Sequence, residues 1–180
     1  MDNICHTLVG AALGEAGLKR SSRLAIPALL LGANLPDVDV LAYLNSPLAA
    51  LAFRRGWTHG PLGLLVLSAL LAALLAGLDR LRRKDDDSPP AAFGPLFLVI
   101  LAAALTHPVL DFLNNYGVRW LMPVDRSWYY GDALFIVDPW VWAALLVGIF
   151  WSRRWERSAA GSGDRDADWS RGAHAWCCTG

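Results

Sequence analysis

His107 and Asp111 are the two residues whose types and spacing point most directly to chemistry. They lie four positions apart in an otherwise apolar stretch, residues 91–113, so in a helix an imidazole and a carboxylate share one face, one turn apart. Ionisable side chains in a lipid-spanning segment are costly, and they normally face a cavity, a partner or an ion. Further candidate ligands recur at the ends of neighbouring apolar segments: His6, Asp37, Asp39, His59, Asp132 and Asp138.

Imidazole and carboxylate side chains in this number predict a divalent metal site. Zinc suits the donor set best, with manganese and iron as alternatives, and about two or three ions could share the ligands. Asp37 and Asp39 follow Pro36, which we expect to end the preceding helix. In an extended stretch residues two apart point the same way, so both carboxylates would face one site. A metal site there could bind phosphate oxygens and lower the pKa of a bound water to make a nucleophile near neutral pH.

Two arginines, Arg54 and Arg55, precede His59 and suggest how a phosphoryl group would be held. Guanidinium groups bind phosphate through paired hydrogen bonds, although an ion pair with Asp37 or Asp39 is the alternative. We take Arg55 and Asp132 as the candidate catalytic residues. The candidate metal ligands are His6, Asp37, Asp39, His59, His107, Asp111 and Asp138. Taken alone, Asp138 before Pro139 is also typical of a helix cap.

The composition predicts an all-α integral membrane protein. The 180 residues are 55% hydrophobic, with a mean hydropathy of +0.35, and the long Leu/Ala runs lack the alternation of strands. The clearest spans are Gly60–Leu78, Ala91–Leu110 and Asp138–Trp151, while Ile4–Leu18 and Leu24–Leu35 are marginal as full crossings. We therefore expect a small helical bundle of about three to five membrane-embedded helices.

The basic residues predict how such a bundle is oriented. If every apolar segment crosses, one side receives Lys19, Arg20, Arg23, Arg80, Arg82, Arg83, Lys84, Arg153, Arg154 and Arg157. By the positive-inside rule that side is cytoplasmic. The candidate ligands then fall on or near the opposite side, so we expect the site to face outward from the cell (inner) membrane.

The polar end of the chain sets the domain boundary. We assign residues 1–157 to one membrane-embedded domain, because residues 158–180 are rich in Gly, Ser, Asp and Arg and lack periodicity, which predicts a disordered tail. A truncated or frame-shifted reading frame is one interpretation of this end. The acidic start of the chain argues against a cleavable signal peptide. The formal net charge of zero gives no reason to expect a nucleic-acid partner.

Several short motifs, in their combined order, resemble the YdjM-like family of membrane-bound metal-dependent hydrolases. These are His-Thr at 6–7, Asn-Leu-Pro-Asp-Val-Asp at 34–39, Arg-Gly-Trp-Thr-His-Gly at 55–60 and Thr-His-Pro-Val-Leu-Asp at 106–111, and residues 131–140 resemble a later stretch. The family is in turn distantly similar to zinc-dependent phospholipase C, an all-helical enzyme with several zinc ions. The resemblance implies phosphoester hydrolysis, with His59, His107 and Asp111 as the principal ligands and Asp37 or Asp39 bridging metals.

We therefore predict a membrane-bound metal-dependent hydrolase, whose partners are the lipid bilayer and a phosphoester or lipid-like substrate. Two alternatives stay open. In a non-catalytic membrane protein the polar residues would only stabilise helix packing, and in a metal or proton transporter His107 and Asp111 would form part of a path. A transporter should place ionisable residues through the membrane depth, whereas this sequence groups them at one side, apart from Glu15. That grouping favours the hydrolase.

Overall fold

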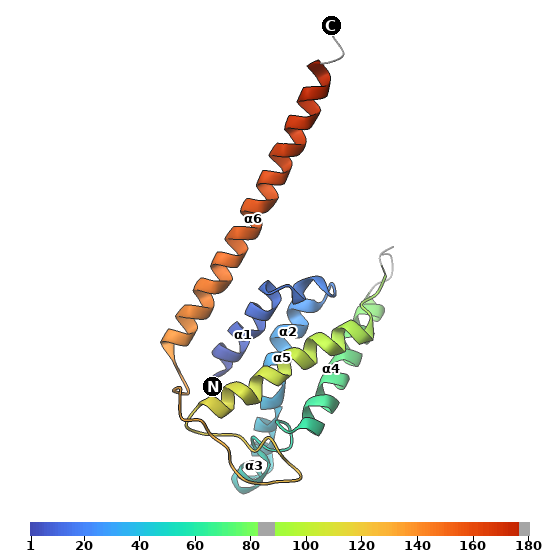
Figure 1. The fold of residues 1–180 in the computed structure, drawn as a ribbon. Helices are drawn as coiled ribbons and strands as arrows, with labels where there is room; N and C mark the ends of the chain where they lie inside the picture. Colours follow the sequence, from blue (N-terminus) through green and yellow to red (C-terminus); the bar gives the residue numbers. More distant parts are fainter. Residues whose placement is uncertain (83–88, 177–180) are drawn as a thin grey trace.

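A computed structural model shows an all-helical chain (Figure 1). It describes residues 1–82 and 89–176, with the side chains of residues 49, 51, 52 and 160–176 left aside. The helices are α1 (Asn3–Glu15), η1 (Leu18–Arg20), α2 (Ala25–Asn34), η2 (Leu35–Leu44), α3 (Pro47–Phe53), α4 (Pro61–Arg82), α5 (Phe93–Leu113) and α6 (Pro139–Trp176). Within the described residues, β pairing is limited to isolated bridges in the segment between α5 and α6. The predicted all-α class is confirmed.

Small residues let the helices of the bundle approach closely. Helix α2 packs against both α1 and α5, and α5 also packs against α4. A Cβ added at Gly10 of α1 would lie 2.8 Å from the carbonyl oxygen of Leu29, and one at Gly32 of α2 would lie 3.0 Å from that of Ile100. Both positions therefore need glycine, as is common where membrane helices touch. The core between them is built mainly from alanine and leucine.

Three helical segments are long and apolar enough to cross a membrane, among the residues that the structure describes. They are Ala25–Leu44, Pro61–Arg82 and Phe93–Leu113. The second and third correspond to the predicted spans Gly60–Leu78 and Ala91–Leu110. The first joins α2 and η2 into one segment, which is longer than the expected Leu24–Leu35. The predicted span Asp138–Trp151 forms the start of α6, and its crossing stays a prediction.

The expectation that residues 37–39 are extended is wrong. Pro36 occupies a position in the first turn of η2, where its missing N–H costs nothing, so the chain continues as a 3₁₀ helix. Asp37 and Asp39 consequently point to different partners, as described below. The two carboxylates reach the same end of the bundle, but by a different geometry from the one that alternation predicts.

Helix α6 begins where the sequence predicts. The carboxylate of Asp138 accepts hydrogen bonds from the backbone N–H groups of Trp140 (3.0 Å) and Val141 (3.3 Å), so it caps the helix. The indole N–H of Trp142 donates to Asp2 (3.2 Å), the cap of α1, which fixes α6 against α1. The helix continues to Trp176, past residue 157. The division of the chain at that residue stays a prediction, and residues 177–180 lie outside the described part.

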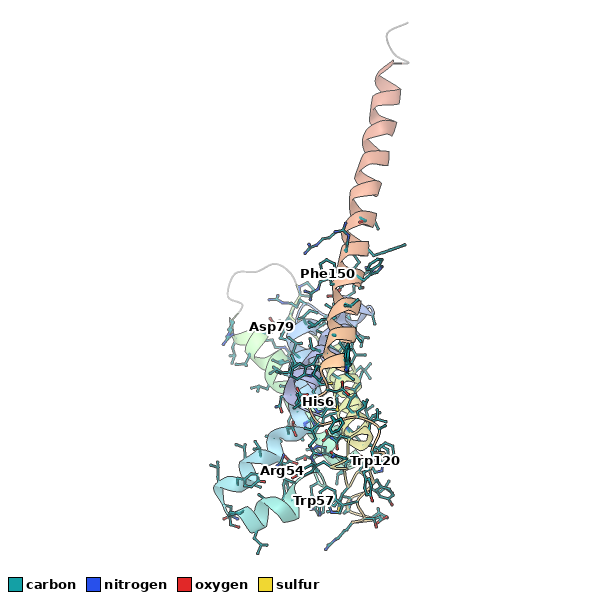
Figure 2. The ribbon with its side chains drawn as sticks, turned by 90° about the vertical axis from the view of Figure 1, so that its left-hand side faces the viewer. His6, Arg54, Trp57, Asp79, Trp120 and Phe150 are labelled. Carbon is teal, nitrogen blue, oxygen red and sulfur yellow. The ribbon has the colours of Figure 1, made fainter. Side chains whose placement is uncertain are left out.

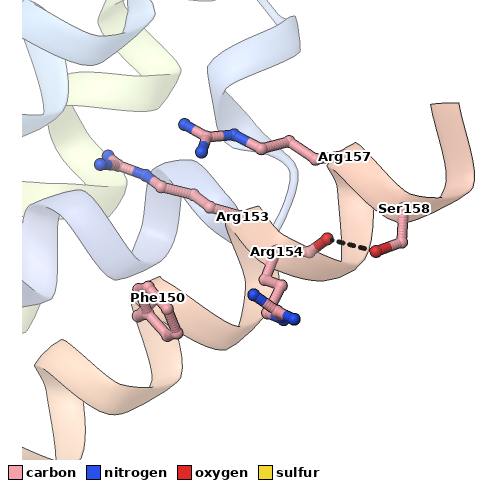
Figure 3. Close-up of a pocket in the computed structure, with 5 residues that line it drawn as sticks. All are labelled: Phe150, Arg153, Arg154, Arg157 and Ser158. Carbon is pink, nitrogen blue, oxygen red and sulfur yellow. Dashed lines mark hydrogen bonds between the residues drawn. The ribbon is translucent and has the colours of Figure 1, made fainter. Parts of the chain in front are cut away.

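Ion pairs hold the basic connections together at one end of the bundle. Lys19 lies 2.5 Å from both Glu15 and Glu156, and Arg153 lies 2.7 Å from Glu15. Figure 3 shows how Arg153, Arg154 and Arg157 follow Phe150 on α6, where they line a pocket of about 460 Å³. Of the basic loop after α4, residues 83–88 lie outside the described part. The end of the bundle with His6 and Arg54 is the opposite one (Figure 2).

Candidate metal centre

Three histidines from separate segments meet around Asp111. His6 comes from α1, His59 from the loop before α4, and His107 lies one turn before Asp111 on α5. The side chains of all four are buried, at 0–1% exposure. The i, i+4 pair therefore shares a face, as its spacing predicts, and two distant histidines complete the cluster. Sequence spacing alone does not reveal that all four converge.

The Asp111 carboxylate is shared by all three imidazoles. Its Oδ1 lies 3.5 Å from His6 Nε2, and its Oδ2 lies 3.5 Å from His59 Nε2 and 3.6 Å from His107 Nε2. The Met1 α-amino group also pairs with Oδ1. Each Nε2 is therefore directed at one carboxylate, at distances longer than a direct hydrogen bond.

The other ring nitrogens of two histidines fix their tautomers. His107 Nδ1 lies 2.7 Å from the carbonyl oxygen of Ala33, which only accepts, so Nδ1 carries the proton. His59 Nδ1 lies 2.9 Å from Thr58 Oγ1, and that hydroxyl donates to Asp39 Oδ2 at 3.2 Å, so it accepts from Nδ1–H. In its neutral form, each of these two rings would therefore direct the lone pair of its Nε2 toward Asp111. Metal-binding histidines are oriented in this way by a carbonyl or carboxylate behind the ring.

Several polar atoms of the cluster are buried without a hydrogen-bond partner: both ring nitrogens of His6, the Nε2 atoms of His59 and His107, and Oδ2 of Asp111. Buried polar atoms are normally satisfied, and leaving one unpaired in a low-dielectric interior is costly. Because these atoms are mainly acceptors that face one another, a bound cation would satisfy them together. The donor set therefore fits a metal.

The ligand atoms fall into two groups within the described residues. His6, His107 and Asp111 form one, and Asp37, His59 and His107 form the other; within each, the ligand atoms lie within 4.8 Å of one another. His107 belongs to both, and its Nε2 lies 3.5 Å from Asp37 Oδ1. The two groups are therefore contiguous, although the single free Nε2 of His107 can bind only one ion at a time. Five predicted ligands are thus brought together.

Asp39 lies behind this cluster. Its Oδ2 lies 3.5 Å from His59 Nδ1, the ring nitrogen directed away from Asp111, and accepts hydrogen bonds from Thr58 and from the backbone N–H of Arg55 (2.7 Å). Its geometry suits orienting His59 through Thr58. Sequence reasoning singled out Asp39 as a ligand but missed Thr58, although the Thr-His pair was the available signal.

Two arginines approach the cluster from the loop before α4. Arg55 is 8% exposed; its Nε lies 3.7 Å from Asp111 Oδ2, and its guanidinium donates to the carbonyl oxygen of Gly117 at 3.1 Å. Its φ of 51° lies in the left-handed region, a conformation that side chains other than glycine adopt at a cost and that is frequent at functional sites. Arg54 Nε lies 3.7 Å from Asp39 Oδ1, which matches the ion pair considered as its alternative role.

Besides Asp39 and Arg55, two further predicted residues lie outside both groups. Asp138 caps α6, as described above, and this accounts for its carboxylate. Asp132 is exposed, with φ of 48°. It lies in a turn beside the end of α5, where Gly131 and Ala133 donate backbone hydrogen bonds to Phe112 and Leu113. Their predicted site roles remain untested by this arrangement.

Fold and site together define a small helical integral membrane protein with a buried His/Asp cluster that fits a metal. The chain belongs to the YdjM inner membrane protein family, whose model matches residues 1–163. It is also similar, at 26% identity over 157 residues, to the "Uncharacterized protein YfhP" of Bacillus subtilis, a match that covers 83% of this chain and 45% of that protein. The chain thus spans less than half the length of this relative. No solved structure matches the chain.

Proposed function

We propose that this protein is a metal-dependent hydrolase of phosphoesters. One observation carries the proposal: the Nε2 atoms of His59 and His107 are buried, lack a hydrogen-bond partner and are directed at Asp111 Oδ2. Zinc is the ion that suits these ligands best, with manganese and iron as alternatives, and the two groups would hold one or two ions, with His107 bound to only one of them. The implied similarity to zinc-dependent phospholipase C stays a prediction.

A divalent ion held there would polarise a phosphoryl oxygen and lower the pKa of a bound water. In the hydrolysis, the water oxygen bonds to phosphorus, the bond from phosphorus to the leaving oxygen breaks, and the leaving oxygen keeps the electron pair. The chain's own residues supply the rest. Asp111 lies among the three imidazoles and orients them. Arg55 places a permanent positive charge beside the cluster, with which a phosphoryl group would form charge-assisted hydrogen bonds. Asp132, in the segment that follows α5, is the candidate base that would accept the proton lost by the attacking water.

The two alternatives have less support. A path for ions across the bundle needs polar groups along its length, but between the cluster and Asp79, near the far end of α4, Ser68 is the one polar residue of α4 that is buried within the described part. A purely structural polar cluster would pair its buried nitrogen and oxygen atoms with one another. Here the Nε2 atoms of all three histidines and Oδ2 of Asp111 lack a hydrogen-bond partner, although Oδ1 of Asp111 pairs with the Met1 amino group.

The test is turnover of p-nitrophenyl phosphate and bis(p-nitrophenyl) phosphate by the full-length protein in lipid nanodiscs, loaded with zinc, manganese or iron. We expect His107→Ala to abolish turnover, because His107 belongs to both ligand groups. Arg55→Ala should lower kcat/KM about ten- to hundredfold, since a charge-assisted contact is worth about 1.5–3 kcal/mol.

Arg126→Ala is the matched control, because Arg126 is an exposed arginine of the segment between α5 and α6 and no site role is assigned to it. Its turnover should equal that of the wild type. Metal-loaded wild-type protein that releases no nitrophenolate from either ester would contradict the proposed function. Equal losses in Arg55→Ala and Arg126→Ala would remove the role proposed for Arg55.

A further inference from the structure

An apolar groove of about 500 Å³ lies beside the cluster, between η2 and the segment that follows α3. Its apolar lining comes from Val38, Leu41, Ala42, Phe53 and Trp57, and Asp39 also lines it. Figure 2 shows Trp57 and Arg54 close together at this end of the molecule. The groove therefore combines apolar walls with a carboxylate that belongs to the surroundings of the metal centre.

Asp39 connects the groove to the cluster. Its Oδ2 lies 3.5 Å from His59 Nδ1, and its Oδ1 lies 3.7 Å from Arg54 Nε. The Arg54 side chain is 31% exposed, although its Nε is buried and its Nη1 donates a hydrogen bond to the Tyr43 hydroxyl at 3.3 Å. A molecule seated in the groove is thus one side chain away from the candidate ligands.

The groove lies on a surface that suits contact with lipid. It is formed largely by Ala25–Leu44, one of the three segments able to cross a membrane. Neighbouring apolar side chains are strongly exposed: Val40 at 52%, Leu44 at 86% and Leu48 at 78%. An exposed apolar patch of this kind marks a membrane or ligand contact. In a bilayer, the molecules available to fill such a groove are lipids, through their hydrocarbon chains.

We propose that the groove holds the hydrocarbon chain of the substrate, so that the phosphoester is carried by a membrane lipid. This inference rests on the proposed function and adds the class of substrate. The chain would lie against Val38, Leu41 and Trp57, while the phosphoryl group would extend past Asp39 toward His59 and Arg54. A water-soluble phosphoester would leave the groove unused.

The experiment compares p-nitrophenyl dodecyl phosphate with p-nitrophenyl methyl phosphate, using zinc-loaded full-length protein in nanodiscs. The dodecyl ester partitions into the bilayer and is therefore favoured whatever the protein binds. The quantity measured is the ratio of kcat/KM for the dodecyl ester to kcat/KM for the methyl ester, compared between each variant and the wild type. Ala42→Trp should fill the groove, and Val38→Phe is a milder substitution at a partly exposed position. Each buried methylene is worth about fourfold in affinity, so we expect the ratio to fall at least about tenfold in Ala42→Trp and less in Val38→Phe.

Leu98→Trp is the matched control, because Leu98 lies on α5, is 64% exposed and does not line the groove. Its ratio should equal that of the wild type. If the wild type hydrolyses the esters but neither groove variant changes the ratio, the inference is overturned while the proposed function stands, and the groove holds only bulk lipid. If zinc-loaded wild type hydrolyses neither ester, the proposed function fails and this inference fails with it.

Discussion

His6 and His107 stack ring on ring, with centroids 3.7 Å apart and planes 12° from parallel, although they come from α1 and α5. Two imidazolium ions at this separation would repel each other strongly in a buried site. The stack therefore requires at least one neutral ring, and neutral imidazole is the form that binds metal. His59 meets His107 edge-on, with ring centroids 5.0 Å apart. The three rings, which come from three separate segments, thus surround the Asp111 carboxylate as a set of candidate ligands.

The first prediction concerns metal content. Purified wild-type protein should hold one to two transition-metal ions per chain, and zinc should predominate. His107→Ala should lower the content more than His6→Ala, because His107 belongs to both groups and His6 to one. Elemental analysis of detergent-purified protein, with circular dichroism as a check of folding, would measure both.

Asp132→Ala provides the control for this comparison, since Asp132 is exposed and lies outside both groups. Its metal content should match the wild type. Equal content in His6→Ala, His107→Ala and wild type, in protein that is helical, would show that the cluster does not bind metal.

The second prediction isolates Thr58. Its hydroxyl accepts from His59 Nδ1 and donates to Asp39, so Thr58→Val keeps the shape but frees the ring to rotate and change tautomer. We expect zinc affinity to fall about ten- to hundredfold, the usual effect of losing a group that orients a ligand. Thr58→Ser, which keeps the hydroxyl, should stay close to the wild type. Competition with a zinc chelator measures both, and a Thr58→Val affinity equal to that of Thr58→Ser would contradict the role.

The third prediction concerns pH. Burial lowers the pKa of His59 below its ordinary value of 6.5, outweighing the nearby carboxylates of Asp111 and Asp39, which raise it; the nearby His107 also lowers it. With a lowered pKa, the folded protein keeps this imidazole neutral at and above 6.5, so protons compete with metal only in more acidic solution. Zinc affinity should therefore be nearly constant from about pH 8 to 6.5 and fall below that range. A tenfold loss between pH 8 and 7 would show that another group controls binding.

Much of the fold follows from local patterns in the chain. Apolar runs of nearly membrane length predict α4 and α5, and the Asp138–Pro139 pair predicts the start of α6, because both signals depend only on neighbouring residues. The pair His107 and Asp111 is predictable for the same reason. The convergence of His6 and His59 on that pair depends on how α1 and the loop before α4 pack. The sequence places all the candidate ligands near one end of the apolar segments, which indicates that they converge but does not predict their individual contacts.

Other parts of the site depend on tertiary contacts that no local sequence pattern predicts. Pro36 suggests the end of a helix, yet a proline is tolerated in a first turn, and η2 continues the segment with Asp37 and Asp39 facing different partners. The left-handed backbone of Arg55 is set by its contacts with Asp39 and Gly117, which are far apart in the sequence. The place of Arg55 beside Asp111 was therefore accessible only from the structure.

The last prediction concerns which side of the membrane the cluster faces. The basic end of the bundle should be cytoplasmic by the positive-inside rule, which places the cluster and the segment between α5 and α6 outside. Reporter cysteines at Arg82, at the exposed end of α4, and at Ser127, in the exposed segment after α5, would decide it in a background with Cys5→Ala, Cys177→Ser and Cys178→Ser. In intact cells a membrane-impermeant maleimide should label Ser127→Cys but not Arg82→Cys, and both should react after the membrane is permeabilised. Labelling of Arg82→Cys alone in intact cells would reverse the orientation and place the candidate metal centre on the cytoplasmic side, whereas labelling of both would mean that α5 does not separate these positions by a bilayer.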